Sequence, residues 1–344
     1  MSNKVRVLVV DDSTFFQRRI CDILLSEPAI EVVGSASDGL QAVAAARKLK
    51  PDVITMDVEM PVLDGISALK KIMAETPVPV IMLSAYTQEG AAATLNALEA
   101  GAVDFLPKHP NGEHPSDFVA RNLPRRVLAL GRKHQRQGDP TPRARLQPMA
   151  ELERRGHFKL VVIGASTGGP VAVQQLLSAL PATFPLPVLV VVHMPESFTP
   201  TFAARLNSQC RVAVKEAQDG DELQPGHVFL APGGKQMTLQ QRGGKVTLKV
   251  TQGLPGQTYR PCVDITMGSA GSVYPGAILG VILTGMGSDG KQAAMQLKQS
   301  GSTIWSQDEE SCIVYGMPQA VEKAGLSDRV VPLQEMGPLL VKVV

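Results

Sequence analysis

Short runs of apolar residues recur along the chain, and each gap between them is long enough to hold one helix. Val5–Val10 is apolar except for Arg6, as expected for a strand that is buried on both faces. Val53–Met56 and Val80–Leu83 repeat this pattern, with helical periodicity in the segments that separate the runs. Alternation of strand and helix predicts a parallel sheet covered by helices on both faces. The sequence therefore predicts an α/β fold.

The alternating pattern is interrupted once, which predicts two domains. Proline, arginine and glutamine dominate from about Pro124 to Arg155, and a second alternating region opens at Phe158. The chain of 344 residues is too long for one typical domain and long enough for two. We expect a flavodoxin-like (βα)5 domain at residues 1–123, a linker at 124–157 and a second α/β domain at 158–344.

The apolar runs place the strands of both domains. In the first half, strand candidates lie at Val5–Val10, Val32–Ala36, Val53–Met56, Val80–Leu83 and Val103–Leu106. In the second half, they lie at Leu160–Ile163, Val188–Val192, Val228–Ala231 and Ile278–Leu283. A hairpin is predicted around Gly243-Gly244, which separates Met237–Gln241 from Lys245–Val250. We expect the second domain to be doubly wound and mostly parallel, with this antiparallel hairpin added.

Composition is typical of a soluble globular protein, with 44% hydrophobic and 19% charged residues. No apolar run reaches the roughly 18 residues needed to cross a bilayer. The first residues also lack the long apolar core of a signal peptide. The four cysteines are far apart and form no C-x-x-C pair, which favours reduced thiols over a zinc site. We expect a cytoplasmic protein without membrane insertion.

Charge is distributed unevenly along the chain. Residues 1–108 have a net charge of −4 (10 basic, 14 acidic), residues 109–157 of +5 (10 and 5), and residues 158–344 of +1 (14 and 13). A basic segment can bind nucleic acid, but this one is rich in proline and poor in aromatic residues. We interpret it as a solvated linker and expect no nucleic-acid partner.

Three carboxylates follow strands of the first domain. Asp11 and Asp12 come directly after the first strand, and Asp57 ends the third. Because the carboxyl ends of parallel strands meet at one edge, these groups are expected to converge and to need a cation. Oxygen ligands favour Mg²⁺, beside which a carboxylate can accept a phosphoryl group. Ser84 and Lys108 follow the fourth and fifth strands, where they could bind that group.

This pattern, extended by Met60-Pro61, Asp64-Gly65 and Phe105, resembles the response-regulator receiver family over about residues 3–125. The resemblance implies that Asp57 is phosphorylated by a histidine kinase and that Asp11, Asp12 and Asp57 bind Mg²⁺. It also implies that Ser84 and Phe105 act as the switch pair and that Lys108 contacts the phosphoryl group. Alternatively, the individual aspartates are turn and cap residues. The family usually has proline directly after the lysine, whereas here His109 precedes Pro110.

The second domain opens with a glycine-rich turn, Gly164-Ala165-Ser166-Thr167-Gly168-Gly169-Pro170. Its spacing fits G-x-S-x-G, which exposes a nucleophilic serine between a strand and a helix. Two other interpretations are a plain helix cap and a dinucleotide-binding loop. The second of these lacks its middle glycine, which is replaced by Ser166, and lacks an acidic residue at the end of the next strand.

Candidates for a base and an orienting acid also follow strands. His193 ends Val188–Val192, the run predicted to lie beside the serine strand, although a histidine here can be purely structural. Asp289 follows Ile278–Leu283 and is also the expected N-cap of a helix at Lys291–Gln299. Asp221 and Asp264 are weaker candidates because neither directly follows a strong strand. Together Ser166, His193 and Asp289 predict acyl transfer through a serine nucleophile.

These residues lie in motifs that resemble the chemotaxis receptor methylesterase family over about residues 158–344. The motifs are Gly164–Pro170, His193-Met194-Pro195, Arg260-Pro261-x-Val263-Asp264, Leu283–Gly290 and Gln307–Pro318. The resemblance implies a triad of Ser166, His193 and Asp289, with backbone N–H groups of Thr167 and Met286 at the oxyanion site and no cofactor in the esterase.

The same resemblance implies a substrate and a mode of control. The enzyme would remove methyl esters from glutamates of methyl-accepting chemotaxis receptors, deamidate receptor glutamines, and gather at receptor clusters. An acidic receiver would cover the esterase until Asp57 is phosphorylated. Two departures from the family pattern are Gln236, where histidine is usual, and Ile265-Thr266-Met267, where a Leu-Phe pair is common. We expect neither to touch the triad and both to bear on the substrate groove and the choice of receptor. A DNA-binding response regulator is the alternative, which the nearly neutral second half does not favour.

Overall fold

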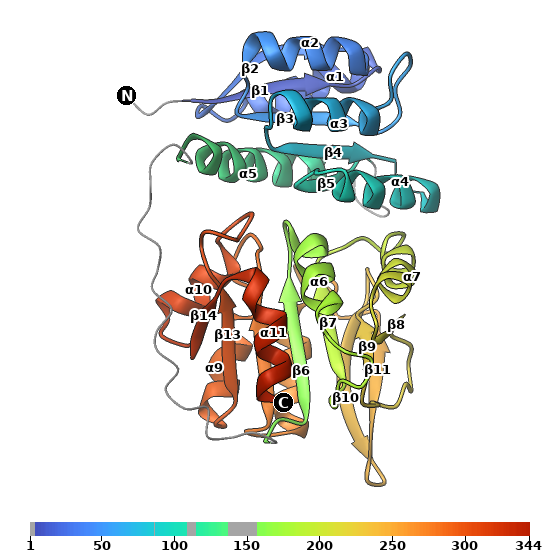
Figure 1. Ribbon diagram of the computed structural model, residues 1–344, viewed down its shortest axis with the longest axis vertical. Helices are drawn as coiled ribbons and strands as arrows, with labels where there is room; N and C mark the ends of the chain where they lie inside the picture. The colour runs from blue at the N-terminus through green and yellow to red at the C-terminus, as the bar shows by residue number, and fades with distance from the viewer. Residues whose placement is uncertain (1–3, 86, 109–114, 137–156) are drawn as a thin grey trace. The chain divides into compact units, whose positions relative to one another are not determined.

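The computed structural model describes residues 4–85, 87–108, 115–136 and 157–344. The chain divides into two compact units, residues 1–143 and 144–344, each with its own sheet (Figure 1). No helix within the described ranges is long and apolar enough to cross a membrane.

The first unit is a five-stranded parallel sheet in the order β2-β1-β3-β4-β5, as the alternating pattern predicts. Helices capped by Ser13, Asp38 and Asp64 follow the first three strands. The elements are β1 (Val5–Val10), α1 (Thr14–Leu25), β2 (Ile30–Ala36), α2 (Gly39–Leu49), β3 (Val53–Asp57), α3 (Gly65–Glu75), β4 (Val80–Ser84), α4 (Gln88–Glu99), β5 (Asp104–Pro107) and α5 (Pro115–Arg136).

Helix α5 corrects the predicted linker at residues 124–157. Residues 124–136 are the second half of this helix, which packs against β1 and α1. Its apolar side chains Leu123, Val127 and Leu130 are buried. Many arginines and an internal Pro124 hid this apolar stripe in the sequence. The rest of the predicted linker falls largely outside the described residues.

The second unit contains a seven-stranded parallel sheet in the order β14-β13-β12-β6-β7-β9-β8 and a separate antiparallel hairpin of β10 and β11. The predicted strands and hairpin are confirmed, whereas the short strands β8, β13 and β14 were not predicted. The strands are β6 (Leu160–Ala165), β7 (Val188–Val192), β8 (Ala213–Glu216), β9 (His227–Leu230), β10 (Gln236–Arg242), β11 (Lys245–Thr251), β12 (Ile278–Ile282), β13 (Thr303–Gln307) and β14 (Arg329–Val331).

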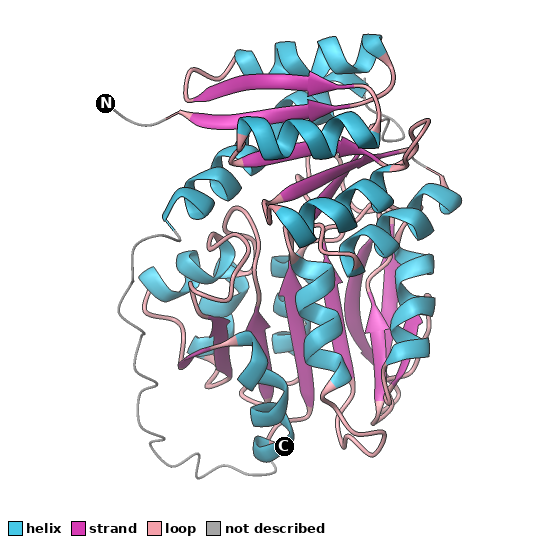
Figure 2. Cartoon of the chain, turned by 45° about the horizontal axis from the view of Figure 1, so that its top comes forward, coloured by secondary structure: helices cyan, strands magenta, loops and turns pink. Residues whose placement is uncertain are grey.

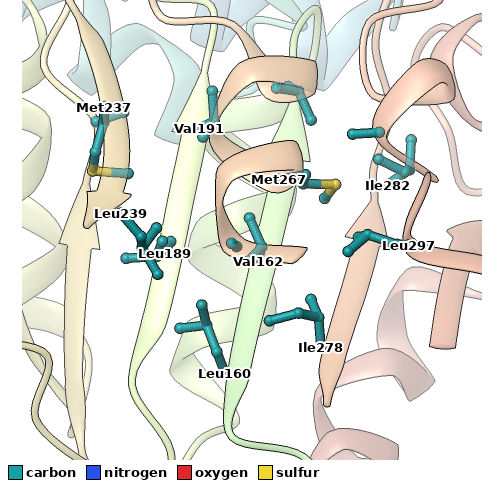
Figure 3. Packing of buried hydrophobic residues seen from close by; sticks show 14 of the residues in the cluster. Leu160, Val162, Leu189, Val191, Met237, Leu239, Met267, Ile278, Ile282 and Leu297 are labelled. Atoms are coloured by element: carbon teal, nitrogen blue, oxygen red, sulfur yellow. The ribbon is translucent and has the colours of Figure 1, made fainter. Parts of the chain in front are cut away.

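Helices cover both faces of the second sheet, as Figure 2 shows. They are α6 (Gly169–Ser178), α7 (Thr199–Gln209), α8 (Val263–Val273), α9 (Lys291–Gln299), α10 (Met317–Lys323) and α11 (Leu333–Val343). Helix α8 packs on β6, β7 and β12, and the hairpin strand β10 packs beside it. Figure 3 shows side chains of β6, β7, β10 and β12 gathered around Met267 of α8. This core fixes the ends of β6, β7 and β12 relative to one another.

Candidate active site and acidic pocket

Ser166 lies between the end of β6 and the start of α6. Its backbone N–H donates to the Thr284 carbonyl oxygen (3.0 Å), which ties it to the loop after β12. A Cβ atom on Gly285 would lie only 2.9 Å from the Ser166 Cβ, so glycine is needed for this close approach. Pro170 lies in the first turn of α6, as predicted. Ser166 itself is half-buried.

His193 follows β7, the strand that pairs with β6. Its backbone N–H donates to the carbonyl oxygen of Ala165, the residue before Ser166 (3.2 Å). The ring nitrogen Nε2 lies 2.8 Å from Oδ2 of Asp289. The other ring nitrogen, Nδ1, is buried and has no hydrogen-bond partner among the described residues. The ends of β6, β7 and β12 thus lie next to one another, and Nδ1 makes no hydrogen bond within the described part of the chain.

The Asp289 carboxylate accepts several hydrogen bonds besides that of His193. Backbone N–H groups of Val263 (2.7 Å), Asp264 (2.9 Å) and Gly290 (3.0 Å) donate to it, as does the Cys262 thiol (3.2 Å). Burial alone would raise the pKa of Asp289, but the interaction with His193 and these N–H groups lowers it to about 2. Asp289 is therefore an ionised partner for the imidazole.

The predicted role of Asp289 as N-cap of the helix at Lys291–Gln299 is wrong. Gly290 is the N-cap of α9 and makes no side-chain cap. Asp289 instead binds the free N–H groups in the first turn of α8. In return, Asp264 of α8 accepts from Ala293 N–H in the first turn of α9 (2.7 Å). The two aspartates thus cap each other's helix, which stabilises negative charge at both helix N-termini.

The weaker acid candidates have other partners. Asp264 faces α9, and burial, with the nearby Asp289 charge, raises the pKa of its carboxyl despite the bond from Ala293. Asp221 pairs with Lys215 (2.7 Å) and accepts from the Gln218 N–H (2.8 Å). Of the three acids, Asp289 is the one that binds His193.

Thr167 directly follows Ser166 in the loop between β6 and α6, and Met286 lies in the loop after β12. Within the described part of the chain, the backbone N–H of neither residue donates a hydrogen bond. The Thr167 hydroxyl is buried without a partner among those residues.

Sequence reasoning missed the buried polar residues that join these loops. The Thr284 hydroxyl donates to the Thr167 carbonyl oxygen (2.9 Å) and accepts from the Val314 N–H (3.0 Å). The Gln307 side chain accepts from the Thr284 N–H (2.8 Å). Both side chains are almost fully buried. A polar residue at the end of an apolar strand was the available signal, and it was not applied to Thr284 or Gln307.

In the first unit, the predicted acidic residues converge. One carboxylate oxygen each of Asp11, Asp12 and Asp57 lies within 4.8 Å of the others. Lys108 joins them, with Nζ 2.7 Å from Asp11 and 2.6 Å from Asp57. Burial raises the pKa of Asp57 to about 6, with a further contribution from Asp11 and against the effect of Lys108. Three convergent oxygen donors fit a divalent cation.

The remaining predicted residues of this pocket are buried. Ser84 ends β4, and its hydroxyl has no partner among the described residues. The Phe105 side chain is buried in β5, and its carbonyl oxygen accepts from Arg126 of α5 (3.0 Å). Lys108 is also held over the Phe16 ring, 4.9 Å from its centre. His109 and Pro110 lie outside the described residues.

The fold and the two sites define the class of protein. A parallel sheet with an acidic pocket precedes an α/β domain in which a histidine and an aspartate bond to each other beside a strand-to-helix turn that contains a serine. Residues 7–115 match the response regulator receiver domain, and residues 161–340 match the CheB methylesterase family. The chain belongs to the CheB methylesterase family.

Similar proteins span the same length. The chain is 48% identical to a protein-glutamate methylesterase/protein-glutamine glutaminase of Alkalilimnicola ehrlichii over 98% of this chain and 99% of that protein. A protein of Vibrio cholerae with the same activities in its name is 47% identical over 97% of each chain. The CheB methylesterase catalytic domain of Thermotoga maritima is 41% identical, with a TM-score of 0.53, over 54% of this chain and 99% of that domain. The DNA-binding alternative is not supported, because the segment after the receiver matches the methylesterase family.

Proposed function

We propose that this chain is a phosphorylation-activated protein-glutamate methylesterase that also deamidates protein glutamines. Relatives that match nearly its whole length carry both activities in their names. The observation that carries the proposal is the bond between His193 Nε2 and Asp289, formed beside the nucleophile turn. Its substrates are glutamyl methyl esters and glutamines of methyl-accepting chemotaxis receptors, and its phosphodonor is a chemotaxis histidine kinase.

The reaction uses Nδ1 of His193 as the base. The Ser166 hydroxyl oxygen bonds to the ester carbonyl carbon while its proton moves to Nδ1. The ester bond then breaks, methanol leaves with that proton, and a glutamyl ester remains on Ser166. Water attacks the same carbon, gives a proton to Nδ1, and glutamate departs as Ser166 recovers its hydrogen. With a glutamine substrate, the leaving group is ammonia.

Asp289 and the two loops stabilise the charges that develop. The ionised Asp289 holds Nε2 as the protonated nitrogen, so that Nδ1 is free to accept a proton. It also stabilises the imidazolium that results. The backbone N–H groups of Thr167 and Met286, which donate to no residue that the structure describes, are the proposed donors to the oxyanion. One such donor is typically worth about 10²–10³ in rate.

Control begins at the acidic pocket. Asp57 is the proposed phosphoacceptor, and Asp11, Asp12 and Asp57 are the residues that would hold Mg²⁺, which neutralises the charge of the incoming phosphoryl group. Lys108, already bound to Asp57, and the Ser84 hydroxyl, which has no partner among the described residues, would contact the phosphoryl oxygens. Phe105 is the proposed partner of Ser84 in the switch.

The test of the esterase is release of methanol from a methylated receptor and of ammonia from a receptor with glutamine at the same positions. We expect the wild-type chain to release both and Ser166→Ala to lose both, by at least about 10³-fold. Ser178→Ala, which changes an exposed serine in the helix that follows Ser166, is the matched control and should keep wild-type rates. Methanol release by Ser166→Ala at the wild-type rate would reject the proposal.

A further inference from the structure

Tyr259 covers one face of the His193 ring. The two rings are stacked, with their centres 4.2 Å apart and an angle of 6° between their planes. Tyr259 comes from the segment between β11 and α8, whereas His193 follows β7. The imidazole is therefore held at its edge by Asp289 and over one face by a ring from a separate loop.

A buried amide fixes the segment that carries Tyr259. The Gln236 side chain, only 2% exposed, donates from Nε2 to the Tyr259 carbonyl oxygen (2.7 Å). Its Oε1 accepts from the Cys262 N–H (3.0 Å). Nε2 also lies 3.2 Å from Oε1 of Gln257, which accepts from the Leu254 N–H. Gln236 thus binds the loop on both sides of Tyr259.

The far end of the Tyr259 ring reaches the loop that follows β12. A Cβ atom on Gly287 would lie 3.1 Å from the Tyr259 hydroxyl oxygen, so the missing side chain leaves room for it. Gly287 directly follows Met286. One aromatic ring therefore lies against both the proposed base and the proposed oxyanion loop.

We propose that Tyr259 is a positioning residue for His193 and that Gln236 holds it in place. Stacking restricts rotation of the imidazole, which keeps Nε2 on Asp289 and directs Nδ1 toward the serine. The electron-rich face of the phenol ring also attracts the imidazolium that forms after proton transfer. This inference rests on the proposed role of His193 as the base.

The test compares two variants of the full-length, phosphorylated chain in methanol release from a methylated receptor. Tyr259→Phe keeps the ring and should retain most of kcat. Tyr259→Leu removes the flat face and should lower kcat about 10- to 100-fold with little change in KM. Tyr274→Leu, at the far end of α8, is the matched control. Gln236→Met removes the three side-chain hydrogen bonds to this loop and should also lower kcat.

Each contrary outcome overturns the inference. Equal kcat for the wild type and Tyr259→Leu would show that the ring has no role. Loss of activity in Tyr259→Phe as large as in Tyr259→Leu would assign the effect to the hydroxyl. A rise in KM at constant kcat would make Tyr259 a substrate contact. The emission of Trp305, buried in the same unit, shows whether each variant is folded.

A second readout separates this inference from the proposed function. A phosphonofluoridate labels a serine that has an active base, and it needs no receptor. We expect Ser166 labelling to slow in Tyr259→Leu and to recover in Tyr259→Phe. If the wild type released neither methanol nor ammonia, the proposed function would fail, yet the labelling rates would still decide the role of Tyr259.

Discussion

At the scale of single residues, the Asp289 carboxylate has two roles. It orients His193 through Nε2, and it caps α8 through the N–H groups of Val263 and Asp264. Hydrogen bonds from His193 and from the backbone N–H groups of Asp264 and Val263 keep the buried carboxylate ionised, because they outweigh its loss of hydration. The negative charge of Asp289, which the proposed chemistry requires, thus also stabilises the fold.

This double role predicts a pH-dependent stability. The pKa of Asp289 falls from 3.8 to about 2 on folding, so its contribution of about 2 kcal/mol is present above pH 4. This contribution is lost as the pH falls toward 2, because the Asp289 carboxylate is protonated at a higher pH in the unfolded chain than in the folded chain. The emission of Trp305, the single tryptophan, reports denaturant unfolding of the second unit. The stability gap between the wild type and Asp289→Asn should shrink by about 1 kcal/mol between pH 5 and pH 3. A gap independent of pH would contradict this account.

The sequence predicted Ser166, His193 and Asp289 because each follows an apolar strand, and parallel strands end at one edge. It could not predict the exchange of caps between Asp289 and Asp264. That exchange depends on how α8 and α9 pack. Because Asp289 directly precedes α9 in the sequence, α9 was the helix that it was expected to cap. Tyr259 was missed for the same reason, since nothing in its own loop indicates which ring it meets.

At the scale of elements, the site is made of loops that are joined by buried polar side chains. Thr284, after β12, binds the loop of Ser166 through Thr167 and the loop after β13 through Val314. Strand β13, which supplies Gln307, was not predicted because Thr303–Gln307 is short and mixed in character. The linker prediction failed at α5 because charged residues surround its apolar stripe.

We expect Thr284→Val to destabilise the second unit and to lower esterase activity. Valine keeps the approximate volume but leaves the buried Val314 N–H and Thr167 carbonyl oxygen without their partner, at about 1–3 kcal/mol. Thr284→Ser keeps the hydroxyl and is the control. Denaturant unfolding followed by Trp305 emission measures both. Equal stability of the valine and serine variants would show that these bonds do not hold the loops.

At the scale of the whole molecule, the chain joins a response regulator receiver domain to a methylesterase domain. A small acyl phosphate with Mg²⁺ should raise methanol release by the full-length chain about 5- to 150-fold, the usual range for coupling between two sites. Asp57→Asn, or chelation of the metal, should remove this stimulation while leaving the basal rate. Asp22→Asn, on α1 of the same unit, is the control. Equal stimulation of Asp57→Asn and the wild type would assign phosphorylation to another residue.

The central claim is that Ser166 becomes covalently bound to the receptor glutamate. Rapid quenching of the phosphorylated chain with a methylated receptor fragment, followed by mass spectrometry, tests it directly. We predict a receptor fragment attached to Ser166 that appears as methanol is released and decays as the free carboxylate forms. Release of methanol in a single turnover, with no adduct on Ser166 at any time and an undiminished rate in Ser166→Ala, would contradict the account.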